Sequence, residues 1–167
     1  MEFSTWGTIG GLDRLAEMRE LVRRDPPPPY DVLGLEIGAA EKGRVEVHWT
    51  PGERQLNRGG VVHGGWIAAA LDEVGGLAAV STSNPAVPHL TMSLGVDYLR
   101  PLRAGVPYTV TGRVLQGGNT RVLIRVEITD PEGVLHAQAS SSMTPNRKFM
   151  AAAKAAREAE EARAAQG

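Results

Sequence analysis

Cysteine is absent from this chain of 167 residues. That absence excludes disulfide scaffolds, cysteine zinc sites, iron–sulfur clusters and thiol nucleophiles. The charge is balanced, with 18 Lys and Arg against 19 Asp and Glu, so the basic surface typical of nucleic-acid-binding proteins is missing and no nucleic-acid partner is expected. The four histidines lack the HExxH or HxxxH spacing of a catalytic metal site, and we expect no metal.

Signals for export and membrane insertion are also missing. The first 11 residues contain neither a basic nor an apolar segment. No apolar run reaches the roughly 18 residues of a membrane span, because Asp72 and Glu73 interrupt the longest candidate, residues 66–80. We therefore expect a cytoplasmic protein without membrane contact. At this length the chain forms one domain that needs no disulfide or metal for stability.

Hydrophobic periodicity divides the chain into three parts. Residues 1–30 combine a loose start over residues 1–10, an amphipathic helix over residues 12–24 and an extended polyproline linker over residues 26–29. A PxxP ligand for another protein is the alternative to the linker. Residues 31–146 form the central domain. Residues 147–167 are an Ala-rich helical tail that buries little, with a partner-binding helix as the alternative.

Six segments of the central domain read as strands, most of them by a period-2 alternation. They cover residues 33–38, 43–50, 90–99, 108–116, 121–129 and 134–143. In the third segment the alternation turns Met92, Leu94, Val96 and Tyr98 inward. Turns at residues 117–119 and 131–133 make the last three segments antiparallel neighbours. Such alternation leaves one face of the sheet wet and one face covered.

The cover is predicted to be the segment from Gly65 to Val80, which is apolar on all sides except at its two carboxylates. A helix without a polar face belongs inside a protein. About 16 residues of helix span about 24 Å, close to the length of a seven-residue strand. The sequence therefore predicts an α+β fold in which an antiparallel sheet of five to six strands wraps around one long central helix.

Asp72 is the better candidate for a carboxylate beside a substrate channel. Its helical neighbours are all Gly or Ala, which form a shallow stripe that a ligand can approach. The alternative is a buried structural acid paired with an arginine. Glu73 lies about 100° further around the helix, so the two carboxylates are not expected to act on the same spot. We expect Glu73 to make a structural ion pair or to contact solvent.

Gly64 and Gly65 stand where the helix begins and where backbone N–H groups lack partners. These amides could stabilise a carbonyl that develops negative charge, as in an oxyanion hole. A tight turn that merely needs glycine is the alternative. Asp72 lies about 12 Å further along the helix, too far to share one carbonyl with Gly64 within one chain. If both act on one substrate, a second subunit must supply one of them.

Two residues before the helix are weaker candidates. His63 has no serine nucleophile elbow and no orienting Asp to work with, so we interpret it as a residue that fixes the loop before the helix. Asn57 could orient a water or a carbonyl, or it could simply form a turn. Motifs for nucleotide triphosphates and dinucleotides do not occur.

The combined pattern, Asn57-x5-His63-Gly64-Gly65-x6-Asp72, resembles the signature of hotdog-fold acyl-CoA thioesterases, in particular those of the phenylacetate-degradation type. Residues 96–105 and 130–137 resemble the same family, and the resemblance covers about residues 30–145. It implies a hotdog fold and an enzyme that hydrolyses an acyl- or aryl-CoA thioester. Coenzyme A is then part of the substrate, and no separate cofactor is implied.

The resemblance also implies roles for single residues. The Gly64 N–H would polarise the thioester carbonyl, while Asp72 of the facing subunit would act as general base or nucleophile. Asn57 would position the thioester or the water, and His63 would support the loop. Dimers, often paired into tetramers, are implied as well. The substrate-binding residues would be Gly65, Trp66, Gly76, Arg100, Arg103 and Arg121, with Arg147 as a further phosphate contact.

At one position the sequence departs from the family pattern. Several relatives carry Ser, Thr or Gln where this chain has Gly76, which leaves the positioning of the water open. Trp66 is also bulkier than the residue that usually follows HGG in this family, and it could narrow the tunnel that holds the acyl chain. The alternative function is a non-catalytic acyl-CoA-binding protein of the same fold. A hydratase or dehydratase of the same fold is the third hypothesis, but the Asp/His pair that such enzymes use is not recognisable in this sequence.

Overall fold

The computed structural model describes residues 6–164, which contain one antiparallel sheet of six strands in the order β1-β2-β4-β5-β6-β3. The strands are β1 Leu35–Glu41, β2 Arg44–Trp49, β3 His89–Tyr98, β4 Tyr108–Gln116, β5 Val122–Thr129 and β6 Leu135–Pro145. The last three strands of the chain are antiparallel neighbours, as the turn residues predicted. The expected sheet is therefore confirmed.

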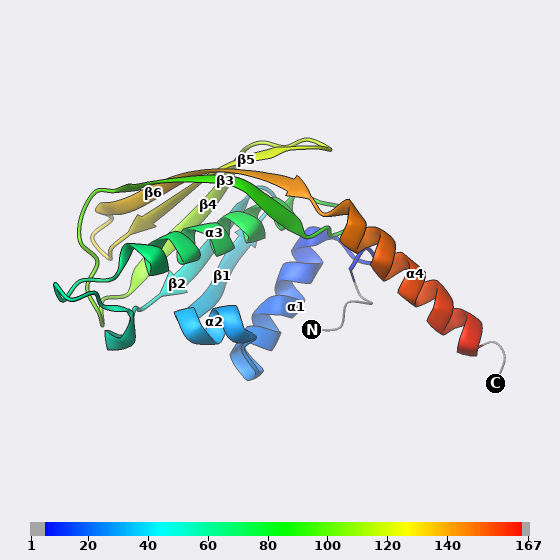
Figure 1. Ribbon diagram of the computed structural model, residues 1–167, viewed down its shortest axis with the longest axis horizontal. Helices are drawn as coiled ribbons and strands as arrows, with labels where there is room; N and C mark the ends of the chain where they lie inside the picture. The colour runs from blue at the N-terminus through cyan, green and yellow to red at the C-terminus, as the bar shows by residue number, and fades with distance from the viewer. Residues whose placement is uncertain (1–5, 165–167) are drawn as a thin grey trace.

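Helix α3, Gly64–Ser81, lies along the inner face of this sheet, which curves over it (Figure 1). Its apolar side chains pack against alternating residues of β2, β4 and β5, and both sets are fully or almost fully buried. Gly112 of β4 lets the helix come close, because a Cβ there would lie 2.9 Å from the carbonyl oxygen of Val74. The wrapped central helix predicted from its apolar surface is confirmed.

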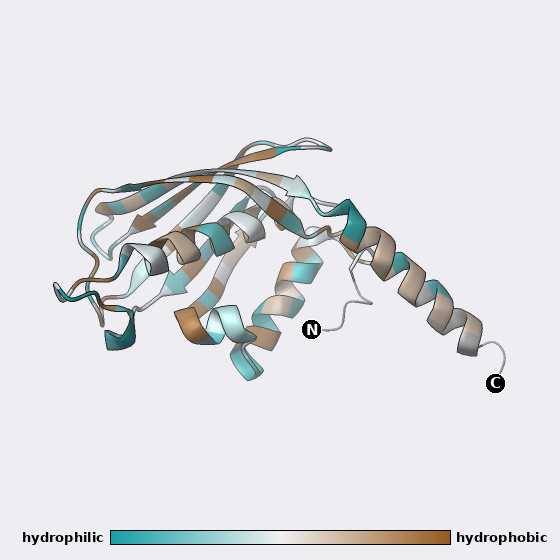
Figure 2. Ribbon diagram, in the orientation of Figure 1, coloured by the Kyte–Doolittle hydropathy of each residue, from teal (hydrophilic) through white to brown (hydrophobic). Residues whose placement is uncertain are grey.

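Three more helices and one short 3-10 turn complete the part of the chain that the structure describes. Helix α1, Gly11–Arg24, packs against β1 and α3, and the short helix α2, Pro28–Leu33, follows it. A 3-10 turn over Glu53–Gln55 precedes α3. Helix α4, Arg147–Ala164, extends away from the sheet (Figure 1). Figure 2 shows hydrophobic residues alternating with hydrophilic ones along the strands, in line with one covered face.

The expected polyproline linker is wrong in its second half. Pro26 and Pro27 precede the helix and Pro27 is extended, whereas Pro28 and Pro29 open helix α2. Proline suits the first turn of a helix because its fixed φ is helical and the missing N–H has no partner there in any case. The strand expected at residue 33 therefore begins two residues later, at Leu35, because Leu33 still belongs to α2.

The chain start is also more ordered than expected, as far as it is described. Residues 1–5 of the segment expected to be loose lie outside the described residues. Trp6, in contrast, is buried, and its ring meets the ring of Phe149 edge-on at 6.2 Å. Phe149 and the buried Ala153 fix the first turns of α4. The described side chains after Ala153 are exposed, as expected for the tail.

Strand β3 departs from its predicted pattern because it is an edge strand. Leu94 and Val96 pack against the core, but Met92 is 63% exposed and Tyr98 is 54% exposed. The register shifts between Thr91 and Ser93, so Met92 occupies a bulge and loses its inward position. Strict alternation assumes an uninterrupted strand, and local sequence does not reveal a bulge.

The sequence predicted no membrane contact, and the structure tests one part of this prediction, namely whether a helix could span a membrane. Within residues 6–164, no helix combines the length and apolar character that a membrane span needs. The cytoplasmic location expected from the sequence stays a prediction.

Candidate active site

The amino-terminal end of α3 presents one unpartnered backbone amide. His63 is the N-cap, and its Nδ1 accepts a hydrogen bond from the Gly65 N–H at 3.0 Å. Its carbonyl oxygen accepts from the N–H groups of Trp66 and Ile67 at 2.9 and 3.3 Å. Of the first four amides of the helix, only the Gly64 N–H has no acceptor within residues 6–164. It is therefore the amide that a ligand oxygen can reach.

Tyr98 of the edge strand lies against this amide. Its hydroxyl donates to the carbonyl oxygen of Gly64 at 3.0 Å, and a Cβ at position 64 would lie 3.3 Å from the tyrosine ring. Sequence reasoning placed Tyr98 in the core rather than beside the site. Only the pairing of β3 with β6 brings its far end alongside the start of α3.

Asn57 belongs to a turn at the same end of α3. An isolated bridge between Leu56 and Val62 closes the loop before the helix. The Asn57 Oδ1 accepts hydrogen bonds from the N–H groups of Gly59 at 2.8 Å and of Val61 at 3.4 Å. The side-chain oxygen is thus engaged in the turn. Its amide nitrogen has no acceptor within the described residues and is the group that can face a substrate.

Asp72 lies half-buried near the middle of α3, two turns beyond Gly64. Its Oδ1 accepts a hydrogen bond from the Thr91 hydroxyl of β3 at 2.8 Å. No ion pair among the described side chains includes Asp72, so the alternative of a structural acid paired with arginine is wrong. Sequence reasoning missed Thr91, because nothing near it in the sequence signals that it faces a carboxylate 19 residues earlier.

A cavity of about 310 Å³ opens beside Asp72. Glu73 and Gly76 line it too, so the two adjacent carboxylates share one space despite their angular separation. Gly76 leaves part of the cavity open, since a Cβ at this position would meet nothing within 4 Å. The remaining walls come from α3, from β3 and β6, and from the amino-terminal segment: Leu77, Val80, His89, Thr91, Met143, Trp6, Met18, Pro27, Pro29 and Tyr30.

Among the described residues Glu73 makes no ion pair, so that expectation is wrong, and its side chain is half-buried beside the cavity. The Tyr30 hydroxyl of α2 donates to its Oε1. Burial raises the pKa of Glu73; the Tyr30 hydrogen bond opposes that shift, and the charge of Asp72 adds to it. Burial also raises the pKa of Tyr30, and Glu73 adds to that shift. The pair thus favours a neutral tyrosine beside a carboxyl group that holds its proton more tightly than usual.

The raised pKa of Glu73 predicts a pH-dependent loss of stability. A carboxyl group with a higher pKa in the folded than in the unfolded chain lowers the free energy of unfolding as pH rises above its ordinary pKa of 4.5. Glu73→Gln keeps an acceptor for Tyr30 and carries no charge. We expect the variant to melt at a higher temperature than the wild type at about pH 7.5, and to lose that advantage at about pH 4. Calorimetry at both pH values measures this, and equal differences in Tm would contradict it.

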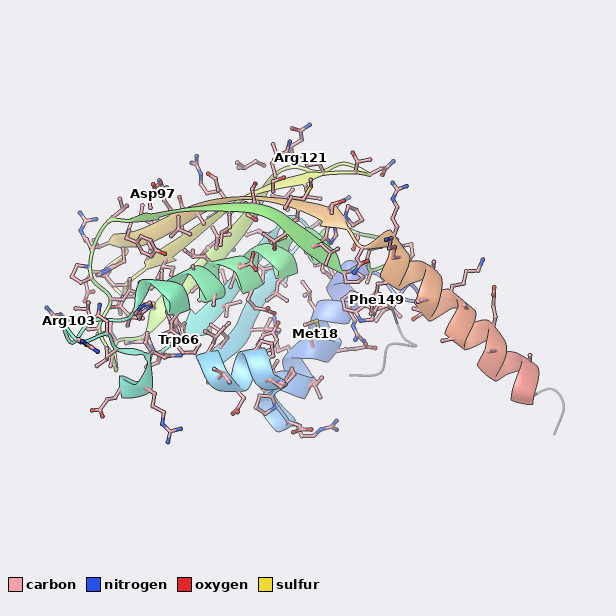
Figure 3. All side chains as sticks on the ribbon, in the orientation of Figure 1. Met18, Trp66, Asp97, Arg103, Arg121 and Phe149 are labelled. Carbon is pink, nitrogen blue, oxygen red and sulfur yellow. The ribbon has the colours of Figure 1, made fainter. Side chains whose placement is uncertain are left out.

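The predicted phosphate contacts fall into two groups. Arg100 donates to the carbonyl oxygen of Leu135 at 2.6 Å, and Arg103 lies in the following loop, at the same end of α3 as Trp66 (Figure 3). Arg121 lies at the far end of the sheet, where it donates to the Ser142 hydroxyl at 2.6 Å (Figure 3). Arg147 donates to the carbonyl oxygen of Asn119 at 2.8 Å. Of these four arginines, only Arg100 and Arg103 therefore lie at the end of the fold where α3 begins.

Comparisons with known proteins show the family of this chain. Residues 59–137 match the model of the thioesterase superfamily. A protein of Saccharolobus solfataricus that carries an esterase name is 39% identical over 113 residues, which are 68% of this chain and 79% of the relative. The medium/long-chain acyl-CoA thioesterase YigI of Escherichia coli is 35% identical over 127 residues, 66% of this chain and 80% of its own.

Solved structures show the same fold. The Streptococcus mutans protein smu.793, bound to acetyl CoA, superposes with a TM-score of 0.63 and 27% identity, covering 67% of this chain and 88% of its own. The E. coli PaaI protein of the phenylacetic acid degradation operon superposes with a TM-score of 0.70 at 22% identity, covering 80% of this chain and 95% of its own. The latter likeness concerns the hotdog architecture alone.

Proposed function

Since this chain belongs to the thioesterase superfamily and is a thioester hydrolase, we propose that it hydrolyses an acyl- or aryl-CoA thioester to the free acid and CoA. One observation carries the proposal: the same helix offers an unpartnered amide at Gly64 and a carboxylate, Asp72, that lines a cavity. The acetyl CoA bound to the S. mutans relative and the acyl-CoA named for YigI support the substrate class.

In this proposal the Gly64 N–H donates to the thioester oxygen as negative charge develops on it. One such donor in an oxyanion hole is worth about 3–4 kcal/mol, and the helix dipole acts in the same direction. The His63 side chain fixes the amide by capping the helix. Asn57, through its free amide nitrogen, positions the thioester or the water. Arg100 and Arg103 contact the CoA phosphates.

Asp72 either activates the water that attacks the carbonyl carbon or attacks this carbon itself. As general base it removes a proton from water, the water oxygen bonds to the carbonyl carbon, and the C–S bond breaks to release the CoA thiolate, which takes up a proton. As nucleophile its carboxylate would bond to the carbonyl carbon, the C–S bond would break to release the CoA thiolate, which takes up a proton, and water would then hydrolyse the resulting anhydride. The hydrogen bond from Thr91 holds the carboxylate in place in either route. Thr91 also brings a hydroxyl to the site, where Gly76 offers no polar side chain.

Two subunits are needed for this chemistry. Eight residues of helix separate Gly64 from Asp72 by about 12 Å, more than one carbonyl and one water can bridge. We infer that the facing subunit supplies Asp72 and that the two copies meet along β3. This edge strand is 10 residues long and exposes Leu90 and Met92 by 53% and 63%. Such an edge invites pairing with another strand. The pairing of dimers into tetramers stays a prediction.

Charges on this edge are expected to separate the subunits. In the double variant Leu90→Lys and Met92→Lys, both copies bring lysines to one interface, and their repulsion opposes pairing. Sedimentation equilibrium should give half the wild-type mass, and turnover should fall by about 100-fold or more because each site loses its carboxylate. Leu115→Lys, at an exposed leucine of β4, is the control and should change neither the mass nor the turnover. A monomer with full turnover would disprove the shared site.

The function itself is tested by thiol release from acetyl-CoA, phenylacetyl-CoA and dodecanoyl-CoA. We expect turnover with at least one of them. The second candidate, a non-catalytic acyl-CoA-binding protein, is favoured by Gly76, which leaves the expected position for a water-holding side chain empty. Calorimetric binding of these acyl-CoAs without any thiol release would replace the first candidate with the second.

A further inference from the structure

One wall of the cavity beside Asp72 comes from the amino-terminal segment, residues 6–33. Its lining residues are Trp6, Met18, Pro27, Pro29 and Tyr30. All of them precede residue 59, where the match to the superfamily model begins. This wall is therefore built from residues outside the matched region.

The segment is firmly attached to α3 rather than resting loosely on it. The Gly11 N–H donates to the carbonyl oxygen of Ser83 at 2.8 Å. A Cβ at Gly11 would lie 1.9 Å from the Val80 carbonyl oxygen, so α1 starts in direct backbone contact with the end of α3. Tyr30 is only 3% exposed and is tied to Glu73 by its hydroxyl. A wall held at both ends can set the size of what the cavity admits.

The dimensions of the cavity define what would fit. Its 310 Å³ equal the liquid volume of about ten waters at roughly 30 Å³ each, and a methylene group is of similar size. Asp72, Glu73, His89 and Thr91 bring polar groups to the cavity, whereas Trp6, Met18, Leu77 and Val80 contribute apolar surface. Met18 of α1 (labelled in Figure 3) is buried and lines the cavity together with Leu77 and Val80 of α3. An acyl group whose carbonyl lies at Asp72 would run toward this apolar end.

We propose that the amino-terminal segment limits the length of the acyl group, with Met18 and Tyr30 as specificity-determining residues. The cavity then takes an aryl group or a straight acyl group of up to about eight carbons, since a ligand does not fill every part of it, and rejects longer chains. The inference rests on the proposed thioesterase function and adds the substrate class to it.

The first test enlarges the cavity with Met18→Ala. The ratio of kcat/KM for dodecanoyl-CoA to that for hexanoyl-CoA should rise at least tenfold, because one methylene in an apolar pocket already changes discrimination about 10- to 200-fold. Leu12→Ala, on the same helix but 40% exposed and outside the cavity, is the matched control and should keep the wild-type ratio.

The second test narrows the cavity with Gly76→Val, which fills open space and does not depend on the stability of the first variant. The ratio of kcat/KM for octanoyl-CoA to that for acetyl-CoA should fall at least tenfold. Thiol release with unchanged ratios in both variants, or a wild type that prefers dodecanoyl-CoA, would overturn the inference while leaving the thioesterase function intact. Absence of thiol release from any acyl-CoA would instead overturn the function itself.

Discussion

Asp72→Asn is expected to lower kcat for acyl-CoA hydrolysis by about 10²- to 10⁴-fold, the usual contribution of a positioned base. Asparagine has nearly the same shape and keeps an oxygen that can accept the Thr91 hydrogen bond, but it cannot take a proton from water or attack a carbonyl. Thiol release under saturating substrate measures the loss. Thermal melting and sedimentation of the variant should match the wild type.

Asp31→Asn is the matched control for this experiment. Asp31 is an exposed carboxylate on α2 that does not line the cavity, so its removal changes the net charge equally without touching the site. It should retain wild-type turnover. If Asp72→Asn retained wild-type turnover as well, the assigned mechanism would be wrong.

Gly64→Pro is expected to lower kcat by about 10²- to 10³-fold, the effect of removing one oxyanion donor. Proline removes the one amide in the first turn of α3 that has no acceptor among the described residues. It also suits the first helical position, and His63 before it has the extended conformation that a residue before proline prefers, with φ −64° and ψ 135°. The helix should therefore form as before, which a thermal melt checks.

Gly64→Ala separates the effect of the amide from that of the side chain. It places the same Cβ against the ring of Tyr98 but keeps the N–H. Turnover in the alanine variant should stay within a few-fold of the wild type, far above that of the proline variant. Equal losses in both variants would assign the effect to the contact with Tyr98 rather than to the amide.

Co-expression of the Asp72→Asn chain with the Gly64→Pro chain tests whether the two subunits share each site. In a mixed dimer, one site combines an intact Gly64 from one chain with an intact Asp72 from the other, and the second site contains both substitutions. Random pairing makes half of the dimers mixed, so co-expression should restore about a quarter of wild-type turnover. No recovery despite mixed dimers on native mass spectrometry would mean that both groups act within one chain.

The central elements of the fold were predictable because their signals are local. The period-2 alternation predicted a strand over residues 121–129, within one residue of β5, and the strand over residues 108–116 was predicted with its observed bounds. Residues 65–80 are apolar on all sides except at Asp72 and Glu73, which predicted that a sheet covers the helix, and β2, β4 and β5 supply that cover. Each of these inferences depends only on side chains within one segment.

The site was predictable only in part. Gly64 at a helix start and Asp72 on a stripe of small residues could be located from spacing alone, because both lie on one helix with a fixed rise and turn. Their surroundings could not. The resemblance put four arginines near the CoA phosphates, yet Arg121 and Arg147 lie at the far end of the sheet from Gly64, since positions along a strand do not reveal which end of the sheet they reach.

The sequence by itself determined the covered sheet, the central helix and the placement of an amide and a carboxylate two turns apart. Only the tertiary structure decided what surrounds them. Thr91 reached Asp72, and Tyr30 reached Glu73 across 43 residues, because separate elements fold onto α3. Met92 turned outward because β3 is a bulged edge. Local periodicity sets which face of an element is buried, whereas contacts between elements depend on chain topology, which no single segment encodes.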